Sequence, residues 1–348
     1  MFKSDRALAG KFSKTISATV LALGVCILSV TASAAGVWPR EAFKQFVDVQ
    51  KNYKIYTEYL PASAGQKTVI LLNGLTYSTR QWDQYIEQLQ KRGVGVLAMD
   101  FKGQGQTLYK YGPALDRINL DDQVVDLVAV LKTLGLTGKH CFVGLSYGGG
   151  VLGALANAHP EVIETAISIA SFVRPLQGQD ITIRSQILAT KLMNPLYPWN
   201  DDELYDFYLR QNVYATYPYA EPIVLEHPYR LEAAFRLAQG IRKFPSLEAA
   251  KSFPKASLHL IIANDDEYVP RVDLEDYWLA VPEEARASKL LIMDSKHKVP
   301  ETVPEFAAAW TELILHNDSR VQSGHAITAY PKEMKVIIDD SQEVIQLQ

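Results

Sequence analysis

Short apolar runs alternate with longer amphipathic stretches along most of this 348-residue chain, and this rhythm constrains its fold more than any other feature. The apolar runs contain many β-branched residues and no polar alternation, which is typical of strands covered on both faces. They lie at residues 68–72, 94–99, 140–144, 165–170, 258–262 and 289–293. Stretches with helical spacing lie at 78–92, 120–134, 147–158 and 302–316. The alternation predicts an α/β fold with a mostly parallel central sheet and helices on both faces.

The strand rhythm stops between residues 172 and 254. This interval has helical spacing broken by prolines, and it is rich in tyrosine. A helical insertion after a strand is expected over the carboxyl edge of a parallel sheet, where ligands bind. We therefore predict a helical cap at 172–254, inserted between core segments 35–171 and 255–317. Most of its aromatic side chains are expected to pack the cap against the core rather than to contact a ligand.

The last part of the chain, residues 318–348, is predicted to be a C-terminal tail. Two apolar segments at 334–338 and 343–347 flank a polar turn, which indicates a hairpin. No function follows from it.

The N-terminus has the pattern of a secretory signal peptide. Basic residues precede an uncharged apolar stretch, 16–30, which is followed by the small residues Ala32, Ser33 and Ala34. Cleavage after Ala34 would give an exported protein, periplasmic or secreted, with no stable membrane insertion. The alternative is an uncleaved membrane anchor, because the uncharged run can be extended to residue 37.

Charge and cysteine content exclude several kinds of site. The formal net charge is -4, and removal of the basic N-terminus would make it more negative, which argues against a nucleic-acid or anionic-membrane partner. Of the two cysteines, Cys26 lies in the signal segment, so the mature chain keeps only Cys141 and has no internal disulfide. Metal-site motifs and a phosphate-binding P-loop are missing from the sequence, and we predict no metal and no cofactor.

A serine stands at a predicted strand-to-helix junction. Residues 144–148 read GLSYG, directly after the expected strand and at the start of the next expected helix. A tight turn there holds the serine in a strained backbone conformation, and the flanking glycines avoid collisions with the neighbouring chain. The hydroxyl is then exposed near the positive end of the helix dipole. The pattern is that of a nucleophile elbow and predicts Ser146 as a nucleophile.

With this elbow in place, the chain from about residue 53 to residue 316 resembles the α/β-hydrolase family. The resemblance implies the α/β-hydrolase fold, with a serine after the fifth strand, an acid after the seventh and a histidine after the eighth. The seventh position is a turn with carboxylates at 265–267, where the family's spacing to a following proline selects Asp266, with Asp265 as the runner-up.

The eighth position leads to His297, the one histidine that follows a predicted strand in the required chain order. The resemblance thus implies a triad in which His297 accepts the Ser146 proton and Asp266 orients the imidazole ring.

Acyl transfer also needs hydrogen-bond donors for the developing oxyanion. The elbow supplies the backbone N–H of Tyr147. The second donor is expected in the loop after strand 68–72, where Asn73-Gly74 resembles the family's His-Gly segment and implies the N–H of Leu75. The asparagine replaces the family's histidine, so the hydrogen bonds that support this loop remain open. A further glycine-rich turn at 100–107 resembles a structural turn of the family rather than a phosphate-binding loop.

The sequence therefore predicts an exported serine hydrolase that cleaves a carboxylic ester through an acyl-enzyme on Ser146. The aromatic cap favours a small ester with an apolar group. One alternative is an aminopeptidase of the prolyl-aminopeptidase type, in which acidic cap residues would bind a free amino terminus; the candidates are Asp201, Asp202, Glu203 and Glu226. Another alternative is a non-catalytic binding protein on the same fold.

Overall fold

The computed structural model describes residues 43–50, 52–112, 118–175, 177–216, 229–321 and 324–348. The chain divides into two units, Met1–Trp38 and Pro39–Gln348, and every described residue belongs to the second. The expected signal peptide at 1–34, and the alternative anchor, lie outside the described residues. No helix within the described ranges combines the length and the apolar composition needed to cross a bilayer.

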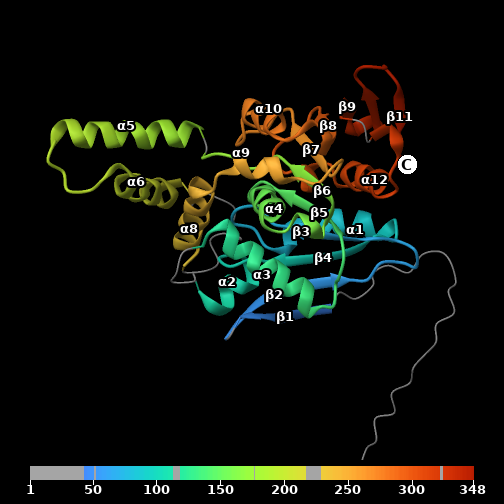
Figure 1. Cartoon of the computed structure of the whole chain (residues 1–348), viewed down its shortest axis with the longest axis horizontal. Helices are drawn as coiled ribbons and strands as arrows, with labels where there is room; N and C mark the ends of the chain where they lie inside the picture. Colours follow the sequence, from blue (N-terminus) through green and yellow to red (C-terminus); the bar gives the residue numbers. More distant parts are fainter. Residues whose placement is uncertain (1–42, 51, 113–117, 176, 217–228, 322–323) are drawn as a thin grey trace, which may run out of the picture. The chain divides into compact units, whose positions relative to one another are not determined.

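The described chain contains an eleven-stranded sheet (Figure 1), with the strand order β1-β2-β4-β3-β5-β6-β7-β8-β9-β10-β11. Neighbouring strands from β4 through β9 run parallel, whereas β1, β2, β10 and β11 extend the sheet with antiparallel pairs. The strands are β1 (Phe43–Gln50), β2 (Tyr53–Leu60), β3 (Thr68–Leu72), β4 (Gly95–Asp100), β5 (His140–Leu145), β6 (Ile163–Ile169), β7 (Leu258–Ala263), β8 (Arg286–Ile292), β9 (His325–Tyr330), β10 (Lys335–Ile338) and β11 (Val344–Gln346).

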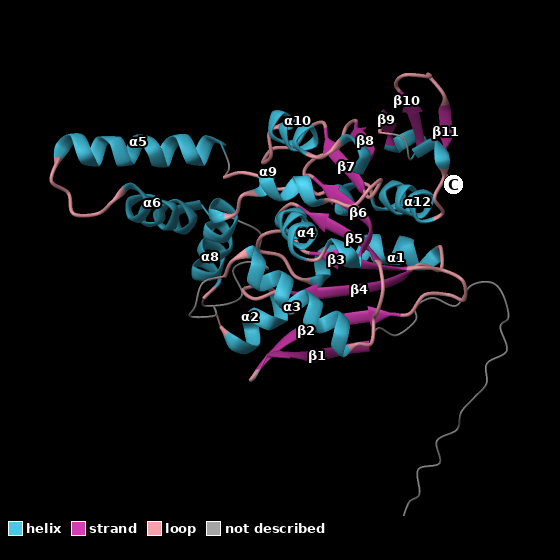
Figure 2. Ribbon diagram, viewed as in Figure 1, coloured by secondary structure: helices cyan, strands magenta, loops and turns pink. Residues whose placement is uncertain are grey.

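Helices occupy most of the connections between strands (Figure 2). The α-helices are α1 (Asp83–Lys91), α2 (Gly105–Tyr111), α3 (Leu120–Thr133), α4 (Tyr147–Ala158), α5 (Gln177–Met193), α6 (Asp201–Thr216), α8 (Arg230–Lys243), α9 (Ser246–Ala249), α10 (Arg271–Ala280), α11 (Val299–Thr302) and α12 (Pro304–Leu315). Short 3-10 turns lie at Thr79–Trp82, Pro160–Val162, Ala250–Ser252, Glu283–Ala285, Ser319–Val321 and Pro331–Glu333.

Two apolar clusters lie on opposite faces of the sheet and explain the continuous apolar runs. On β3, Ile70 and Leu72 belong to the cluster that contains residues of α3, α4 and α10. The intervening Val69 and Leu71 belong to the cluster that contains residues of α1 and α12. Because successive side chains of a strand point to opposite faces, both alternating sets must be apolar. The predicted mostly parallel sheet with helices on both faces is confirmed.

The edges of the sheet were not all expected. Strands β1 and β2 pair in an antiparallel register, and both mix charged or polar residues with apolar ones, so neither reads as a fully buried run. The tail contributes β9, which pairs in parallel with β8. Strands β10 and β11 form an antiparallel pair within the segment where a hairpin was expected, with Val336 opposite Ile345.

The interval 172–254, expected as a cap, contains α5, α6, α8 and α9; we call it the helical segment. Helices α5, α6 and α8 share an apolar cluster of their own, which includes Ile183, Leu204 and Phe235. Helix α8 also packs on the core, because Leu237 and Ile241 belong to the same cluster as α3 and α4. Among the described residues, α8 thus packs both on the α5–α6 pair and on the helices that cover the sheet.

Candidate active site

Ser146 stands between β5 and α4 with a strained backbone. Its φ is 56° and its ψ is -113°, a region that a residue with a side chain rarely occupies. The Ser146 amide donates to the carbonyl of Ile169 at 2.9 Å, so the turn is fixed to the end of the neighbouring strand β6. The residue is only 3% exposed, so the exposed hydroxyl expected from the sequence is not found, and Ser146 is buried at the ends of the strands.

The glycines that follow Ser146 are required by close backbone approach. A Cβ on Gly148 would lie 2.0 Å from the carbonyl oxygen of Leu72, and one on Gly149 would lie 1.7 Å from Oγ of Ser171. A side chain at either position would push α4 away from the ends of β3 and β6. The sequence GLSYGGG therefore allows the helix to begin immediately after the serine.

Asp266 and His297 lie together at the carboxyl ends of adjacent parallel strands. Strand β7 pairs with β8, with Ala263 opposite Ile292, so the turns that follow them meet. Nδ1 of His297 donates to Oδ2 and Oδ1 of Asp266, at 2.8 and 3.0 Å. The two side chains are only 7% and 4% exposed, which shields this hydrogen bond from water.

The turn after β7 distinguishes Asp266 from Asp265. Oδ1 of Asp266 also accepts the backbone amides of Tyr268 and Val269, each at 2.8 Å, and these bonds fix the carboxylate. Asp265 is exposed, and its Oδ1 accepts from the side-chain amide of Asn264 at 3.1 Å. Of the two carboxylates considered from the sequence, Asp266 is the one hydrogen-bonded to His297.

Two aromatic rings flank His297, and sequence reasoning did not identify them. The Tyr268 ring lies 5.1 Å from the imidazole in an edge-on arrangement, and the Phe172 ring lies 5.9 Å away. The Phe172 amide donates to the carbonyl of Ser146 at 3.0 Å. Phe172 therefore contacts both the elbow and the histidine. The sequence could have indicated Phe172 only through its position, directly after β6 at the start of the helical segment.

The loop with Asn73 and Leu75 follows β3, which is the parallel neighbour of β5, with Leu72 opposite Gly144. Asn73 is fully buried and accepts from Nε1 of Trp82 at 2.8 Å. Its amide donates to the carbonyl of Met99 at 2.9 Å and to Oδ1 of Asp100 at 3.2 Å. The asparagine that replaces the family's histidine thus supplies a set of supporting hydrogen bonds.

The backbone N–H groups of Leu75 and Tyr147 are the two predicted oxyanion donors. Within the described residues, neither amide donates a hydrogen bond to another protein group. Tyr147 is the first residue of α4, where helix geometry leaves the N–H without an intrahelical acceptor. Both amides are therefore available as donors at the carboxyl ends of neighbouring strands.

The glycine-rich turn at 100–107 is built around a buried carboxylate. Asp100 accepts the backbone amides of Thr79 and Gln106, each at 2.7 Å. Burial raises the pKa of Asp100 to about 6, although these donors act in the opposite direction. The carboxylate accepts the amide at the start of α2 that a phosphate-binding loop would offer to its anion. The turn therefore has a structural role between β4 and α2. No group of three or more His, Cys, Asp or Glu side chains among the described residues has an arrangement that could hold a metal ion.

Comparison with known proteins gives the family. A family model described as "Serine aminopeptidase, S33" matches residues 63–291, which is more than half of the chain. The chain belongs to the α/β-hydrolase family. The resemblance expected from the elbow and the predicted fold class are confirmed, and the protein is a hydrolase.

Several solved α/β-hydrolases have the same fold. The chain is 20% identical to MGS-M2 from a Medee basin deep-sea metagenome library, with a TM-score of 0.57 over 78% of this chain and 97% of that one. It is 19% identical to a thermophilic esterase from Thermogutta terrifontis, with a TM-score of 0.55 over 80% and 99%. It is 15% identical to the esterase EaEST from Exiguobacterium antarcticum, with a TM-score of 0.58 over 78% and 98%.

One curated relative matches over a shorter stretch of this hydrolase. The bifunctional epoxide hydrolase 2 of Sus scrofa is 31% identical over 101 residues, which is 29% of this chain and 18% of that protein. The chain thus spans less than a fifth of the length of this relative.

Proposed function

We propose that this hydrolase cleaves a carboxylic ester through an acyl-enzyme on Ser146. The observation that carries the proposal is the shielded Asp266–His297 hydrogen bond at the ends of β7 and β8, in the chain order that the Ser146 elbow requires. An aspartate on Nδ1 leaves Nε2 as the basic nitrogen of a neutral imidazole. This is the tautomer that a serine nucleophile needs.

The proposed reaction has two steps. Oγ of Ser146 attacks the ester carbonyl while His297 takes its proton, and the N–H groups of Leu75 and Tyr147 stabilise the oxyanion. His297 then gives the proton to the leaving alcohol, and the acyl-enzyme forms. In the second step His297 removes a proton from water, which attacks the acyl carbonyl, and then returns this proton to Oγ of Ser146 as the carboxylic acid leaves.

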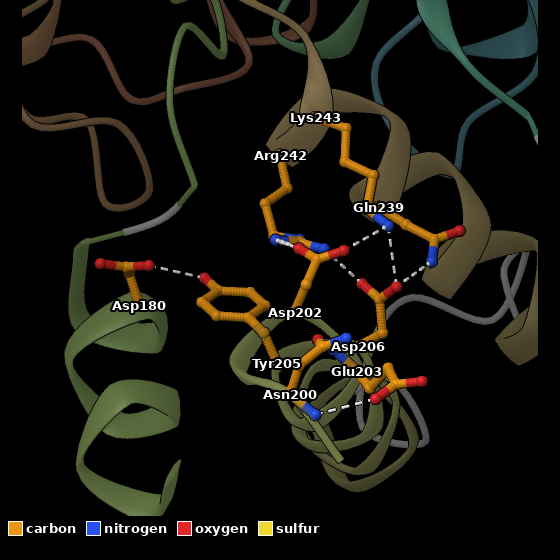
Figure 3. A network of polar contacts seen from close by, with 9 residues as sticks. All are labelled: Asp180, Asn200, Asp202, Glu203, Tyr205, Asp206, Gln239, Arg242 and Lys243. Atoms are coloured by element: carbon orange, nitrogen blue, oxygen red, sulfur yellow. Dashed lines mark hydrogen bonds and ion pairs between the residues drawn. The ribbon is translucent and has the colours of Figure 1, made fainter. Parts of the chain in front are cut away.

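The charges of the helical segment favour an ester over a peptide with a free amino terminus (Figure 3). Asp202 pairs with Arg242 at 2.7 Å and with Lys243 at 3.2 Å. Asp201 pairs with Lys191. These carboxylates are already neutralised inside the segment, so binding an ammonium group would require breaking existing ion pairs.

Glu203 is also engaged locally. Its carboxylate accepts the amide of Asn200 at 2.8 Å, and Oδ1 of Asn200 accepts the amide of Glu203 at 2.9 Å, which forms a capping box at the start of α6. Glu226, the remaining candidate for amine binding, lies outside the described residues. The aminopeptidase alternative therefore keeps the support of the family description, but its three described candidate carboxylates, Asp201, Asp202 and Glu203, already have partners within the segment.

The surroundings of His297 support a substrate with an apolar group. Tyr268 is 48% exposed and lies beside the imidazole. Phe172 also lies beside the imidazole, and it contacts the elbow as well. Exposed aromatic surface next to the proposed base would bury an acyl or alcohol group of apolar character. Because Phe172 lies at the start of the segment 172–254, we also propose that this segment acts as a helical cap.

We further propose that the protein is exported, periplasmic or secreted, with an N-terminal membrane anchor as the alternative. This rests on the sequence of residues 1–34, with its basic start, apolar stretch and small residues before Ala34.

The function is tested with a fluorophosphonate probe and two substrate classes. We expect the probe to label the wild-type protein once and to leave Ser146→Ala unlabelled. The wild type should hydrolyse p-nitrophenyl esters faster than proline-arylamides. A wild-type protein that resists the probe would instead support a binding protein, and preferential cleavage of the arylamides would support the aminopeptidase.

A further inference from the structure

Two buried glutamines hold the loop that carries Leu75. Nε2 of Gln104 donates to the carbonyl of Gly74 at 2.6 Å and to the carbonyl of Leu75 at 3.1 Å. Oε1 of Gln81 accepts the amide of Gly74 at 2.8 Å. Gln104 is 1% exposed and Gln81 is 6% exposed, so these bonds do not compete with bulk water.

The backbone partners fix the orientation of both side-chain amides. Gln104 faces two carbonyl oxygens, and only its NH₂ group can bond to both. Gln81 faces an N–H group, which only its carbonyl oxygen can accept. Among the described residues, the other amide atoms, Oε1 of Gln104 and Nε2 of Gln81, are buried without a hydrogen-bond partner. The side-chain hydrogen bonds that the two glutamines make to described residues therefore all go to the loop.

These contacts determine where the Leu75 N–H points. The carbonyl of Gly74 and the N–H of Leu75 belong to one planar trans peptide unit, in which the two groups point in opposite directions. Fixing the carbonyl toward Gln104 therefore fixes the N–H away from it. The bonds to the amide of Gly74 and the carbonyl of Leu75 fix the peptide units before and after. Three consecutive peptide units are held in this way.

The turn that carries Gln104 is itself rigid. Gln104 lies between Gly103, with φ of 81°, and Gly105, with φ of 43°. A Cβ on Gly105 would lie 2.2 Å from Oδ2 of Asp100. The buried Asp100 carboxylate thus fixes the backbone from which Gln104 reaches the loop.

From this geometry we infer that Gln104 and Gln81 are positioning residues, which orient the Leu75 N–H toward the oxyanion of the ester reaction. The inference rests on the proposed function and assigns a role to the 100–107 turn. The two glutamines act through the loop and do not touch the reacting atoms. Their loss should weaken binding of the transition state and leave binding of the ground-state ester unchanged.

The test compares Gln104→Met with Gln90→Met. Methionine keeps the length of the side chain and removes the donor. The Gln90 amide also donates to a backbone carbonyl, that of Val94 at 2.7 Å, but it lies at the end of α1 away from the loop. We expect kcat on a p-nitrophenyl ester to fall about 100-fold in Gln104→Met with little change in KM. Gln90→Met should retain the wild-type kcat.

A trifluoromethyl ketone gives the second readout, because its adduct with the serine carries an oxyanion. Its affinity should fall with kcat in Gln104→Met, whereas a non-reactive ether analogue of the substrate should bind both proteins equally. If Gln104→Met does not fold, Gln81→Met carries the same test through the amide of Gly74.

The outcomes separate the two claims. A wild-type protein that takes up no fluorophosphonate overturns the proposed function. A wild-type protein that is labelled, with a Gln104→Met variant whose kcat stays within about threefold of Gln90→Met, overturns the positioning role alone. A parallel fall in binding of the ether analogue also overturns it, since a general disruption of the site would act on both states.

Discussion

At the scale of single residues, the choice between two adjacent aspartates is decided by backbone hydrogen bonds. Asp266 accepts two amides of its own turn, and these turn its carboxylate toward Nδ1 of His297. Asp265 points elsewhere and is exposed. A difference of one position in sequence thus separates a group that can orient the imidazole from one that solvates a loop.

We predict that Asp266→Asn lowers kcat on an ester by about 10⁴-fold, because the asparagine favours the wrong imidazole tautomer. Asp265→Asn serves as the matched control and should change kcat by no more than about twofold, since a surface carboxylate is lost. Steady-state kinetics with a p-nitrophenyl ester would measure both. Equal losses in the two variants would remove Asp266 from its proposed role.

At the scale of elements, the strands buried on both faces and the C-terminal hairpin of β10 and β11 were predictable, whereas β1, β2 and β9 were not. The runs that became β3 to β8 are continuous in apolar residues because both faces are covered. Strand β1 pairs at an edge and keeps polar residues such as Lys44 and Asp48. Its sequence therefore lacks a continuous apolar pattern that would distinguish this strand from a loop.

In the candidate site, too, one part could be predicted from the sequence and another could not. The elbow depends on local chain geometry, so five residues of sequence indicate it. The loop proposed to carry the second oxyanion donor is held by Gln104 and Gln81, which both hydrogen-bond to Gly74. Gln81 lies seven residues after Gly74 in the same connection, whereas Gln104 follows β4 and reaches Gly74 only because β3 pairs with β4, which no local pattern indicates.

Strand β7, which leads to Asp266, contains a buried histidine that makes the fold sensitive to acid. His259 is 2% exposed, its Nδ1 lies 2.8 Å from Oγ of Ser288, and burial lowers its pKa to about 3. Between pH 6.5 and 3 the unfolded chain binds a proton that the native strand does not. Stability should therefore fall by about 1.4 kcal/mol per pH unit on acidification through this window from this group alone.

Replacing this histidine should remove that contribution. We predict that His259→Gln has a shallower dependence of the free energy of unfolding on pH between 6.5 and 4 than the wild type, measured by urea denaturation at each pH. Substitution of the exposed His316 by glutamine is the control and should leave the wild-type slope in place. If His259→Gln kept the wild-type slope, β7 of the wild type would have to open enough for the His259 ring to be protonated in the native state.

At the scale of the whole molecule, the middle of the sheet lies between two apolar layers and can be exposed only by extensive unfolding. Cys141 lies in β5, between β3 and β6, and is 2% exposed. Burial raises the pKa of its thiol to about 12. Since the thiolate is the reactive form, the native thiol should be almost inert near neutral pH.

Cys141 should therefore report global unfolding. In a Cys26→Ser background, we predict that iodoacetamide labelling of Cys141 is slow in the native protein and accelerates with urea in proportion to the surface exposed by complete unfolding. A cysteine introduced at the exposed position Ser185 on α5, in a protein that also carries Cys141→Ala, should react at once without urea. Labelling of Cys141 that is slow but independent of urea would mean that β5 opens locally. The two layers would then not unfold as one cooperative unit.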